Sequence, residues 1–158
     1  MVKMAKKEGL YVKSIKNGTV IDHIQSGMAL NVLRILRVDG REGNVLSVVM
    51  NVPSKKMKTK DIVKIENREL KPAEVDKIAL ISPRATINII NEWNVVKKNN
   101  VKFQEVIRGI IKCNNSSCIS NANEPVEPTF TVEHKEPTRI KCHYCNRIME
   151  MEDIISQF

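Results

Sequence analysis

The first hundred residues alternate between two patterns of hydrophobic and polar positions. Strand-like stretches, either rich in β-branched residues or alternating apolar with polar, are predicted at 19–24, 44–52, 61–67 and 85–93. Helical stretches, with apolar residues three or four positions apart, are predicted at 26–40 and between Pro72 and Pro83. This β-α-β-β-α-β order is typical of the α+β, ferredoxin-like fold, in which an antiparallel sheet carries two helices on one face and leaves the other face open.

The boundaries of these elements follow from their flanking residues. The pair Asn17-Gly18 favours a two-residue turn and predicts a hairpin or a bent strand between 10–16 and 19–24. Ser26 is a suitable N-cap for the first helix, and Gly40 is a suitable residue to end it. Two stretches are predicted to connect elements: a basic connector at 54–60 and a linker or short helix at 94–107.

Length and composition narrow the class of protein. The 158 residues are enough for one ordinary domain or two small ones, and 42% hydrophobic with 28% charged residues is a globular composition. Aromatic residues make up only 4%, so the core must be built from aliphatic side chains. No apolar stretch approaches the ~20 residues of a membrane helix, and the N-terminus does not resemble a signal peptide. We therefore expect a soluble, cytoplasmic protein that does not bind a membrane.

The positive charge is unevenly distributed along the chain. The formal net charge is +8, but residues 1–100 carry a balance of +9 and residues 101–158 a balance of −1. An anionic ligand is therefore expected on the first part of the chain. We predict two domains with these bounds: 1–100, which binds the anion, and 101–158, a small and mostly β domain that holds all four cysteines.

The cysteines have the spacing of a metal site. They form two close pairs, C-x4-C and C-x2-C, made by Cys113, Cys118, Cys142 and Cys145. Two such pairs place four thiolates tetrahedrally around one zinc ion, and four protein ligands leave no open position, so the zinc is structural. Disulfides are disfavoured in a reducing cytoplasm. Because four cysteines complete the ligand shell, we expect His134 and His143 to lie at the surface.

Catalytic motifs are missing from the sequence. It contains no nucleophile elbow, no G-x-x-x-x-G-K-[ST] loop and no G-x-G-x-x-G. The one adjacent acid–imidazole pair is Asp22-His23, and neighbouring side chains on a strand point to opposite faces, so the two are not expected to act on each other. We therefore do not expect an enzyme, and the pair is either polar surface or part of a ligand site.

Four stretches of the sequence resemble a known family. They are NGTVIDHI (17–24), MNVPSKKMKTKDIVKIEN (50–67), PRATINII (83–90) and the cysteine segment CNNSSC…CHYC. In this order and with this cysteine spacing, over roughly residues 9–155, the chain resembles the regulatory chain of aspartate carbamoyltransferase.

The resemblance implies a non-catalytic subunit that controls the first committed step of pyrimidine biosynthesis. Its N-terminal domain would bind ATP and CTP as allosteric effectors. Its zinc domain would dock on the catalytic chain, with Asn115 and Tyr144 near that interface. Regulatory chains would also pair as homodimers that link two catalytic trimers.

The resemblance further implies particular nucleotide-binding residues. Asp22 and His23 match positions at the sugar and phosphates. Lys64 matches a lysine near the sugar and base, and Lys98 matches one that binds the ribose and phosphates, as suits ammonium groups facing a polyanion. Positions that line the base pocket or its edge are matched by Val12, Ile15, Val20, Asn88, Ile90, Trp93 and Val95.

A basic zinc-ribbon protein that binds nucleic acid is the alternative. The net charge of +8 supports it. The neutral cysteine segment and the scarcity of aromatic residues for stacking on bases oppose it, so nucleic acid is not the expected partner. A nucleic-acid binder would lose affinity steeply as salt is raised.

Overall fold

The computed structural model of the chain describes residues 13–123 and 126–158. The first part contains β1 (Gly18–Ile24), α1 (Ala29–Ile35), β2 (Leu46–Ser54), β3 (Lys58–Glu66), α2 (Pro72–Ile81), β4 (Thr86–Asn91) and β5 (Asn94–Asn100). The second part contains β6 (Val106–Arg108), a 3-10 turn (Ile119–Asn121), β7 (Thr129–Lys135), β8 (Thr138–Cys142), β9 (Ile148–Met149) and α3 (Met151–Ile155).

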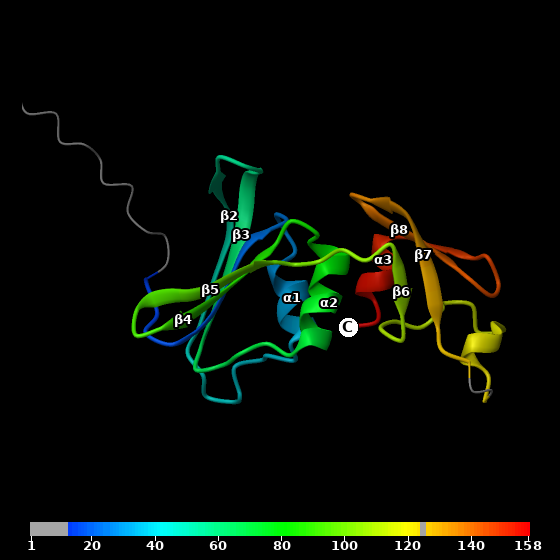
Figure 1. Ribbon diagram of the computed structural model, residues 1–158, viewed down its shortest axis with the longest axis horizontal. Helices are drawn as coiled ribbons and strands as arrows, with labels where there is room; N and C mark the ends of the chain where they lie inside the picture. Colours follow the sequence, from blue (N-terminus) through cyan, green and yellow to red (C-terminus); the bar gives the residue numbers. More distant parts are fainter. Residues whose placement is uncertain (1–12, 124–125) are drawn as a thin grey trace, which may run out of the picture.

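The first part is a five-stranded antiparallel sheet in the order β2-β3-β1-β4-β5. Its first four strands and two helices follow the predicted β-α-β-β-α-β order, so the prediction of a ferredoxin-like α+β fold is confirmed. Both helices lie on one face of the sheet (Figure 1). We call the opposite face, which no helix of the described chain covers, the open face.

The strand β5 corrects the prediction of a linker or short helix at 94–107. Residues 94–100 pair with β4, and part of the remaining stretch forms β6. The two-residue turn between β4 and β5 consists of Glu92 and Trp93, with φ of 45° and 69°. A turn with two positive φ angles normally contains Asn or Gly, so its sequence signal is absent here.

Gly18 is required for close strand pairing rather than for a hairpin turn. Within the described residues no strand precedes it, and β1 begins at Gly18 itself. Its φ is +142°, and a Cβ atom there would lie 2.1 Å from the carbonyl oxygen of Ile65 on β3. Asn17 beside it accepts a hydrogen bond from the backbone N–H of Asn67 at 3.0 Å. The predicted turn is therefore a junction between β1 and the end of β3.

The helix α1 is shorter than the predicted 26–40 and is capped from another strand. Asp61 on β3 is fully buried, and its Oδ2 accepts hydrogen bonds from the backbone N–H groups of Gly27 and Ala29 at 2.9 and 3.0 Å. These bonds satisfy donors at the start of the helix, which otherwise lack partners. Ser26, the predicted N-cap, makes no such bond.

Other boundaries differ by a few residues. The helix α1 ends before a left-handed residue, Arg37 with φ of 53°, and not at Gly40. The strand β2 continues through Pro53, which is tolerated because β2 is an edge strand. The predicted basic connector is consequently reduced to a turn at 55–57. The helix α2 begins at Pro72 as predicted.

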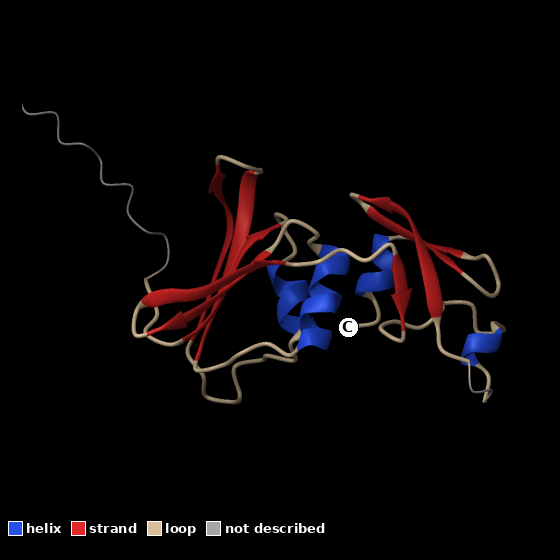
Figure 2. Cartoon of the chain, viewed as in Figure 1, coloured by secondary structure: helices blue, strands red, loops and turns tan. Residues whose placement is uncertain are grey.

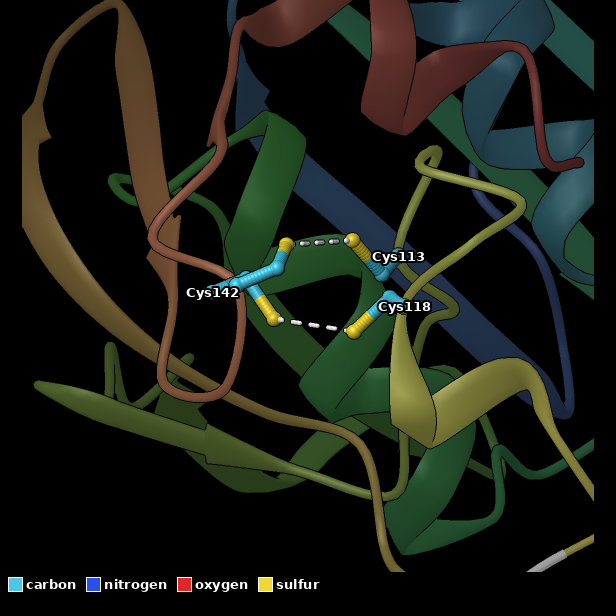
Figure 3. Close-up of side chains that lie close together, drawn as sticks. Cys113, Cys118 and Cys142 are labelled. Atoms are coloured by element: carbon cyan, nitrogen blue, oxygen red, sulfur yellow. Dashed lines mark hydrogen bonds between the residues drawn. The ribbon is translucent and has the colours of Figure 1, made fainter.

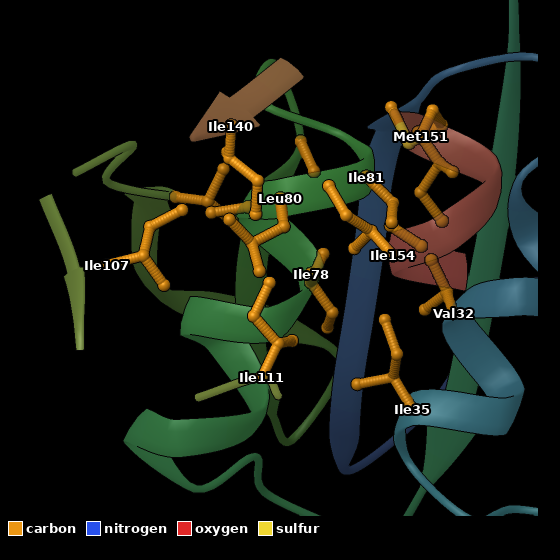
Figure 4. Packing of buried hydrophobic residues seen from close by; sticks show 14 of the residues in the cluster. Val32, Ile35, Ile78, Leu80, Ile81, Ile107, Ile111, Ile140, Met151 and Ile154 are labelled. Atoms are coloured by element: carbon orange, nitrogen blue, oxygen red, sulfur yellow. The ribbon is translucent and has the colours of Figure 1, made fainter. Parts of the chain in front are cut away.

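The helices lie between the two sheets (Figure 2). The second sheet has the order β6-β7-β8-β9, and α3 at the end of the chain contacts α2. Buried aliphatic side chains from both parts form one continuous core (Figure 4), which includes Val32, Ile35, Ile78, Leu80, Ile81, Ile107, Ile111, Ile140, Met151 and Ile154. The prediction of an aliphatic core is confirmed, with Phe130 as its one fully buried aromatic residue among those described.

Two polar contacts also join the parts. The buried Thr138 donates its hydroxyl to the carbonyl oxygen of Leu80 at 2.6 Å, and Arg84 lies 2.8 Å from Glu136. Among the helices of the described chain, none is both long and apolar enough to cross a membrane.

Candidate functional site

The four cysteines meet at one end of the second sheet. Cys113 and Cys118 lie on the loop before the 3-10 turn, Cys142 ends β8, and Cys145 lies in the turn that leads to β9. Their sulfur atoms all lie within 4.8 Å of one another (Figure 3). The structure therefore brings together the complete set of predicted ligands, which we call the tetracysteine centre.

The sulfur–sulfur distances fit a metal ion and not disulfides. Cys113 Sγ lies 3.6 Å from Cys145 Sγ, and Cys118 Sγ lies 3.7 Å from Cys142 Sγ. A tetrahedral zinc site with Zn–S bonds of ~2.3 Å has sulfur–sulfur edges of about 3.8 Å, whereas a disulfide bond is ~2.05 Å long. The arrangement supports a structural metal ion held by four thiolates.

Without a metal, the protonation of this centre is uneven. Burial raises the pKa of the Cys113 thiol to about 12 and also raises the pKa of Cys142. Burial likewise acts to raise the pKa of Cys145, but hydrogen bonds from the Arg147 backbone and the Asn115 side chain outweigh it and lower the value to about 6. Metal binding must therefore displace thiol protons, and affinity for the ion falls as pH falls.

Asn121 supports the cysteine loop and was not predicted. Its amide nitrogen donates to the carbonyl oxygens of Cys113 and Asn115 at 2.8 and 2.7 Å. These bonds hold the loop between the first two ligands in shape, as outer hydrogen bonds do in other metal sites. Its position three residues after Cys118 is the only signal that the sequence offers for this role.

The two residues predicted near the catalytic-chain interface lie beside the centre. Asn115 Oδ1 accepts a hydrogen bond from the Ser117 N–H at 3.1 Å, inside the first cysteine loop. Tyr144 remains 38% exposed and donates its hydroxyl to the carbonyl oxygen of Glu127 at 2.9 Å. His134 and His143 are exposed, as expected. The interface role of Asn115 and Tyr144 stays a prediction.

Most of the predicted nucleotide-binding residues lie on the open face of the first sheet. Lys64 on β3 pairs with Val20 on β1, Val20 with Asn88 on β4, and Asn88 with Lys98 on β5. Directly paired residues in an antiparallel sheet project to the same face. Because the neighbouring Ile21 is fully buried against the helices, this row lies on the open face.

The same register places further predicted residues on this face. Asp22, two residues after Val20, pairs with Thr86, and Ile90 pairs with Val95. Val95 is 58% exposed, and Trp93, which lies in the turn between β4 and β5 and outside this register, is 62% exposed.

Two predicted residues stand apart from this row. Ile15 is buried on the segment before β1, at 5% exposure. Val12 lies outside the described residues.

A β-bulge brings Asp22 and His23 closer together than a regular strand would. The pairing of β1 with β3 shifts between Ile21 and Ile24, and His23 has a positive φ of 53°. His23 Nδ1 consequently lies 3.9 Å from Asp22 Oδ2 and 3.1 Å from the hydroxyl of Thr86. The expectation that the two side chains do not act on each other is therefore wrong, because their charges interact at this distance.

Asp22 forms an ion pair that was not predicted. The ammonium group of Lys60 lies 2.9 and 3.1 Å from the two carboxylate oxygens, and the His23 N–H donates to Oδ1 at 2.6 Å. Burial acts to raise the pKa of Asp22, but the bond from Lys60 and the His23 N–H outweigh it, so this pKa is lowered. An ionised Asp22 accepts hydrogen bonds, for example from sugar hydroxyls, but repels phosphate.

Two basic groups of the open face, His23 and Lys64, have lowered pKa values. Burial lowers the pKa of His23; Asp22 opposes this effect, and the charges of Lys60, Lys56 and Lys98 add to it. Burial also lowers the pKa of Lys64, whose ammonium group donates to the carbonyl oxygen of Lys13 at 3.0 Å. Because several lysine charges act on His23, the end of the open face at His23 has a positive potential that favours binding of an anion.

Sequence comparisons match both parts of the chain. Residues 10–102 match the family described as aspartate carbamoyltransferase regulatory chain, allosteric domain. Residues 105–155 match the family described as aspartate carbamoyltransferase regulatory chain, metal binding domain. The similarity to aspartate carbamoyltransferase regulatory chains therefore extends over nearly the whole chain. The alternative of a basic zinc-ribbon nucleic-acid binder is not favoured.

Named relatives agree with these matches. The chain is 53% identical to the aspartate carbamoyltransferase regulatory chain of Methanothermobacter thermautotrophicus over 98% of this chain and 99% of the relative. It is 55% identical to that of Pyrobaculum arsenaticum, over 92% and 97% of the two chains. It is 51% identical to that of Thermofilum pendens, over 96% of each chain. The chain therefore belongs to the family of aspartate carbamoyltransferase regulatory chains, the non-catalytic subunits that accompany a catalytic chain.

Proposed function

We propose that the chain binds ATP and CTP competitively on the open face of its first sheet and transmits the occupancy of that site to the catalytic chain of aspartate carbamoyltransferase. In this role it controls the first committed step of pyrimidine biosynthesis in the cytoplasm. The proposal combines the family membership with the arrangement of side chains on the open face.

The observation that carries the proposal is the polarity of this face along β1. At one end, Gly18 pairs with Ile90, beside the exposed apolar side chains of Trp93 and Val95. At the other end lies His23, on which several lysine charges act. A nucleoside triphosphate has the same division, with a flat apolar base at one end and a polyanion at the other.

The middle of the face suits the sugar and the edge of the base. Asn88 lies between Val20 and Lys98 in the cross-strand row, and its amide nitrogen lies 3.4 Å from the Val20 carbonyl oxygen. Asp22 presents acceptor oxygens, and Lys64 presents a donor from the opposite strand. We assign the base to the side of Ile90 and the phosphates to the side of His23.

The second part of the chain supplies the link to the catalytic chain. A zinc ion in the tetracysteine centre would keep the cysteine loops folded, and the surface that includes Asn115 and Tyr144 would dock on the catalytic chain. Regulatory homodimers would then connect two catalytic trimers. Zinc is the ion proposed because four thiolate ligands in a closed tetrahedral arrangement are typical of structural zinc.

The continuous core offers a physical route between the two sites. The helices α1 and α2 cover the inner face of the nucleotide-binding sheet, and α2 contacts α3 and the second sheet. A shift of the first sheet would therefore move the docking surface. Coupling of this kind is typically worth about 1–3 kcal/mol and acts in both directions, so a substrate analogue on the catalytic chain should change nucleotide affinity.

Calorimetric titration of the zinc-loaded chain with CTP and ATP tests the binding site. We expect saturable, competitive binding that Lys98→Ala and Lys64→Ala weaken about tenfold, the usual loss for a charge-assisted hydrogen bond. The matched control is Lys97→Ala, because Lys97 pairs with Ile89 and so projects to the opposite face of β5. The proposal fails if a folded wild-type chain binds neither nucleotide, or if Lys97→Ala weakens binding as much as Lys98→Ala.

A further inference from the structure

The charges that act on His23 come from three separate elements. Lys60 lies on β3, Lys98 on β5, and Lys56 in the exposed turn 55–57 between β2 and β3. The charge of Lys60 is already compensated by Asp22. Over residues 13–123 and 126–158, neither Lys56 nor Lys98 has an acidic partner within 4.0 Å. Two uncompensated ammonium groups thus remain near the end of β1.

The turn 55–57 is held beside the loop that follows β1. Ser26 Oγ in that loop donates a hydrogen bond to Thr59 Oγ1 at 2.7 Å, close to the start of β3. Met57 and Gln25, one from each segment, line the same small cavity. The hydrogen bond and the shared cavity place the turn beside the loop after β1, and neither involves the side chain of Lys56, which is exposed.

We propose that this turn forms the phosphate-side wall of the effector site and that Lys56 binds the terminal phosphates of the nucleoside triphosphate. The inference rests on the proposed function, because it requires a nucleotide on the open face with its base toward Ile90. The phosphates then extend along β1 toward His23 and beyond it to the turn. Lys98 contacts them from β5, and Lys56 contacts them from the side of β2 and β3.

This arrangement predicts that Lys56 discriminates by the number of phosphates. A monophosphate with its base near Ile90 would end near His23, short of the turn. Only the outer phosphates of a triphosphate would reach the Lys56 ammonium group. Removing its charge should therefore weaken the triphosphate about tenfold, the diphosphate less, and the monophosphate not measurably.

The test is calorimetric titration of the full, zinc-loaded chain with CTP, CDP and CMP. Lys56→Gln removes the proposed phosphate ligand, and Lys55→Gln is the matched control. Both residues are exposed in the same turn, and both changes remove one positive charge. Lys55 is not among the lysines whose charges act on His23. Zinc content and the midpoint of thermal unfolding, which neither exposed substitution should alter, show that each variant is folded.

The expected result is a loss of CTP affinity in Lys56→Gln that exceeds its loss of CMP affinity and is absent in Lys55→Gln. Wild-type affinity for CTP in Lys56→Gln would overturn this inference and leave the proposed function standing. Equal losses for CTP and CMP, or equal losses in both variants, would also overturn it, because they would indicate only a general electrostatic field. A folded wild-type chain that binds no nucleotide would overturn both proposals.

Discussion

The tetracysteine centre and the open face of the first sheet are two opposite kinds of site. The cysteines come as two pairs that are close in the sequence, and the side chains of Cys113, Cys118 and Cys142 are at most 5% exposed. The residues of the open face come instead from the four strands β3, β1, β4 and β5, which are spread widely along the sequence; Lys98 is exposed, and Lys64, Val20 and Asn88 are half-buried.

This difference shows that the two sites depend on the fold in opposite ways. The second sheet is small, and the metal ion would help to hold it together, so the site stabilises the structure around it. The first sheet is stabilised by its own helices and buried aliphatic side chains, so its open face exists before any ligand arrives. Loss of a ligand residue at the tetracysteine centre should therefore unfold the structure around it. Loss of a ligand residue on the open face should only weaken binding.

Removal of the metal should produce the largest effect. Stripping zinc with a chelator, or replacing a ligand in Cys142→Ser, should unfold the cysteine loops, because a structural zinc site contributes on the order of 10 kcal/mol. We expect loss of assembly with the catalytic chain, measured by size-exclusion chromatography, and retention of CTP binding, measured by calorimetry.

The exposed Ser116, in the same cysteine loop, provides the control for this experiment. Ser116→Ala should retain both zinc and assembly. If metal-free chain still assembles normally with its partner, the proposed division of labour between the two parts is wrong.

A substitution at Gly18 should damage the open face of the first sheet and leave the tetracysteine centre intact. In Gly18→Ala the new Cβ atom would lie 2.1 Å from a backbone oxygen of β3, so the pairing of β1 with β3 must shift. We expect a loss of about 3 kcal/mol in the free energy of unfolding and weakened CTP binding, with the zinc content unchanged. Denaturant unfolding, calorimetry and metal analysis measure the three quantities.

Gly40→Ala separates backbone strain from the steric clash. Gly40 also has a positive φ, of 83°, but no atom lies within 4 Å of its missing Cβ. It should lose only about 1–2 kcal/mol, the ordinary cost of a left-handed conformation. Equal losses in the two variants would show that the close approach at Gly18 is unimportant.

Protonation of His23 should affect the open face and not the tetracysteine centre. The pKa of His23 lies below its ordinary value of 6.5, chiefly because of burial, so the unfolded chain binds more protons than the folded chain as pH falls through 6.5. The nucleotide-free chain therefore loses stability in that range. A triphosphate near the imidazole reverses the effect by raising its pKa, so CTP binding at pH 6 should take up a fraction of a proton.

Calorimetry in two buffers with different ionisation enthalpies measures this uptake. His23→Gln should abolish it, whereas His134→Gln, at an exposed position of β7, should not change it. Uptake that persists in His23→Gln would mean that another group near the nucleotide is titrated.

The ion pair between the two parts should have the smallest effect. Arg84 and Glu136 lie 2.8 Å apart, but their side chains are 57% and 41% exposed. A double-mutant cycle should give a coupling of about 0.2–1 kcal/mol that decreases with salt, as for other exposed pairs. A coupling above about 2 kcal/mol would show that the charges, and not the aliphatic core, hold the two sites together.

The sequence predicted the order of elements better than their ends. The β-branched runs and the apolar repeats identified six elements of the first part, because burial of one face requires those periods. The start of α1 was missed because its cap, Asp61, comes from a strand more than thirty residues away. The strand β5 was missed because its turn, Glu92-Trp93, lacks the usual residues and its strand is rich in lysine and asparagine.

By itself, the sequence determined the tetracysteine centre and the likeness to a regulatory chain. Metal ligands can be recognised in a sequence by their residue type and close spacing, because two cysteines separated by a few residues can bind the same ion from one short loop. The open face needed the tertiary structure, because a shift of one residue in register moves every side chain of a strand to the other face. Only the folded sheet therefore decided that Lys64, Val20, Asn88 and Lys98 form one row across four strands. It likewise decided that Lys60 forms an ion pair with Asp22, and that Lys56 lies near His23.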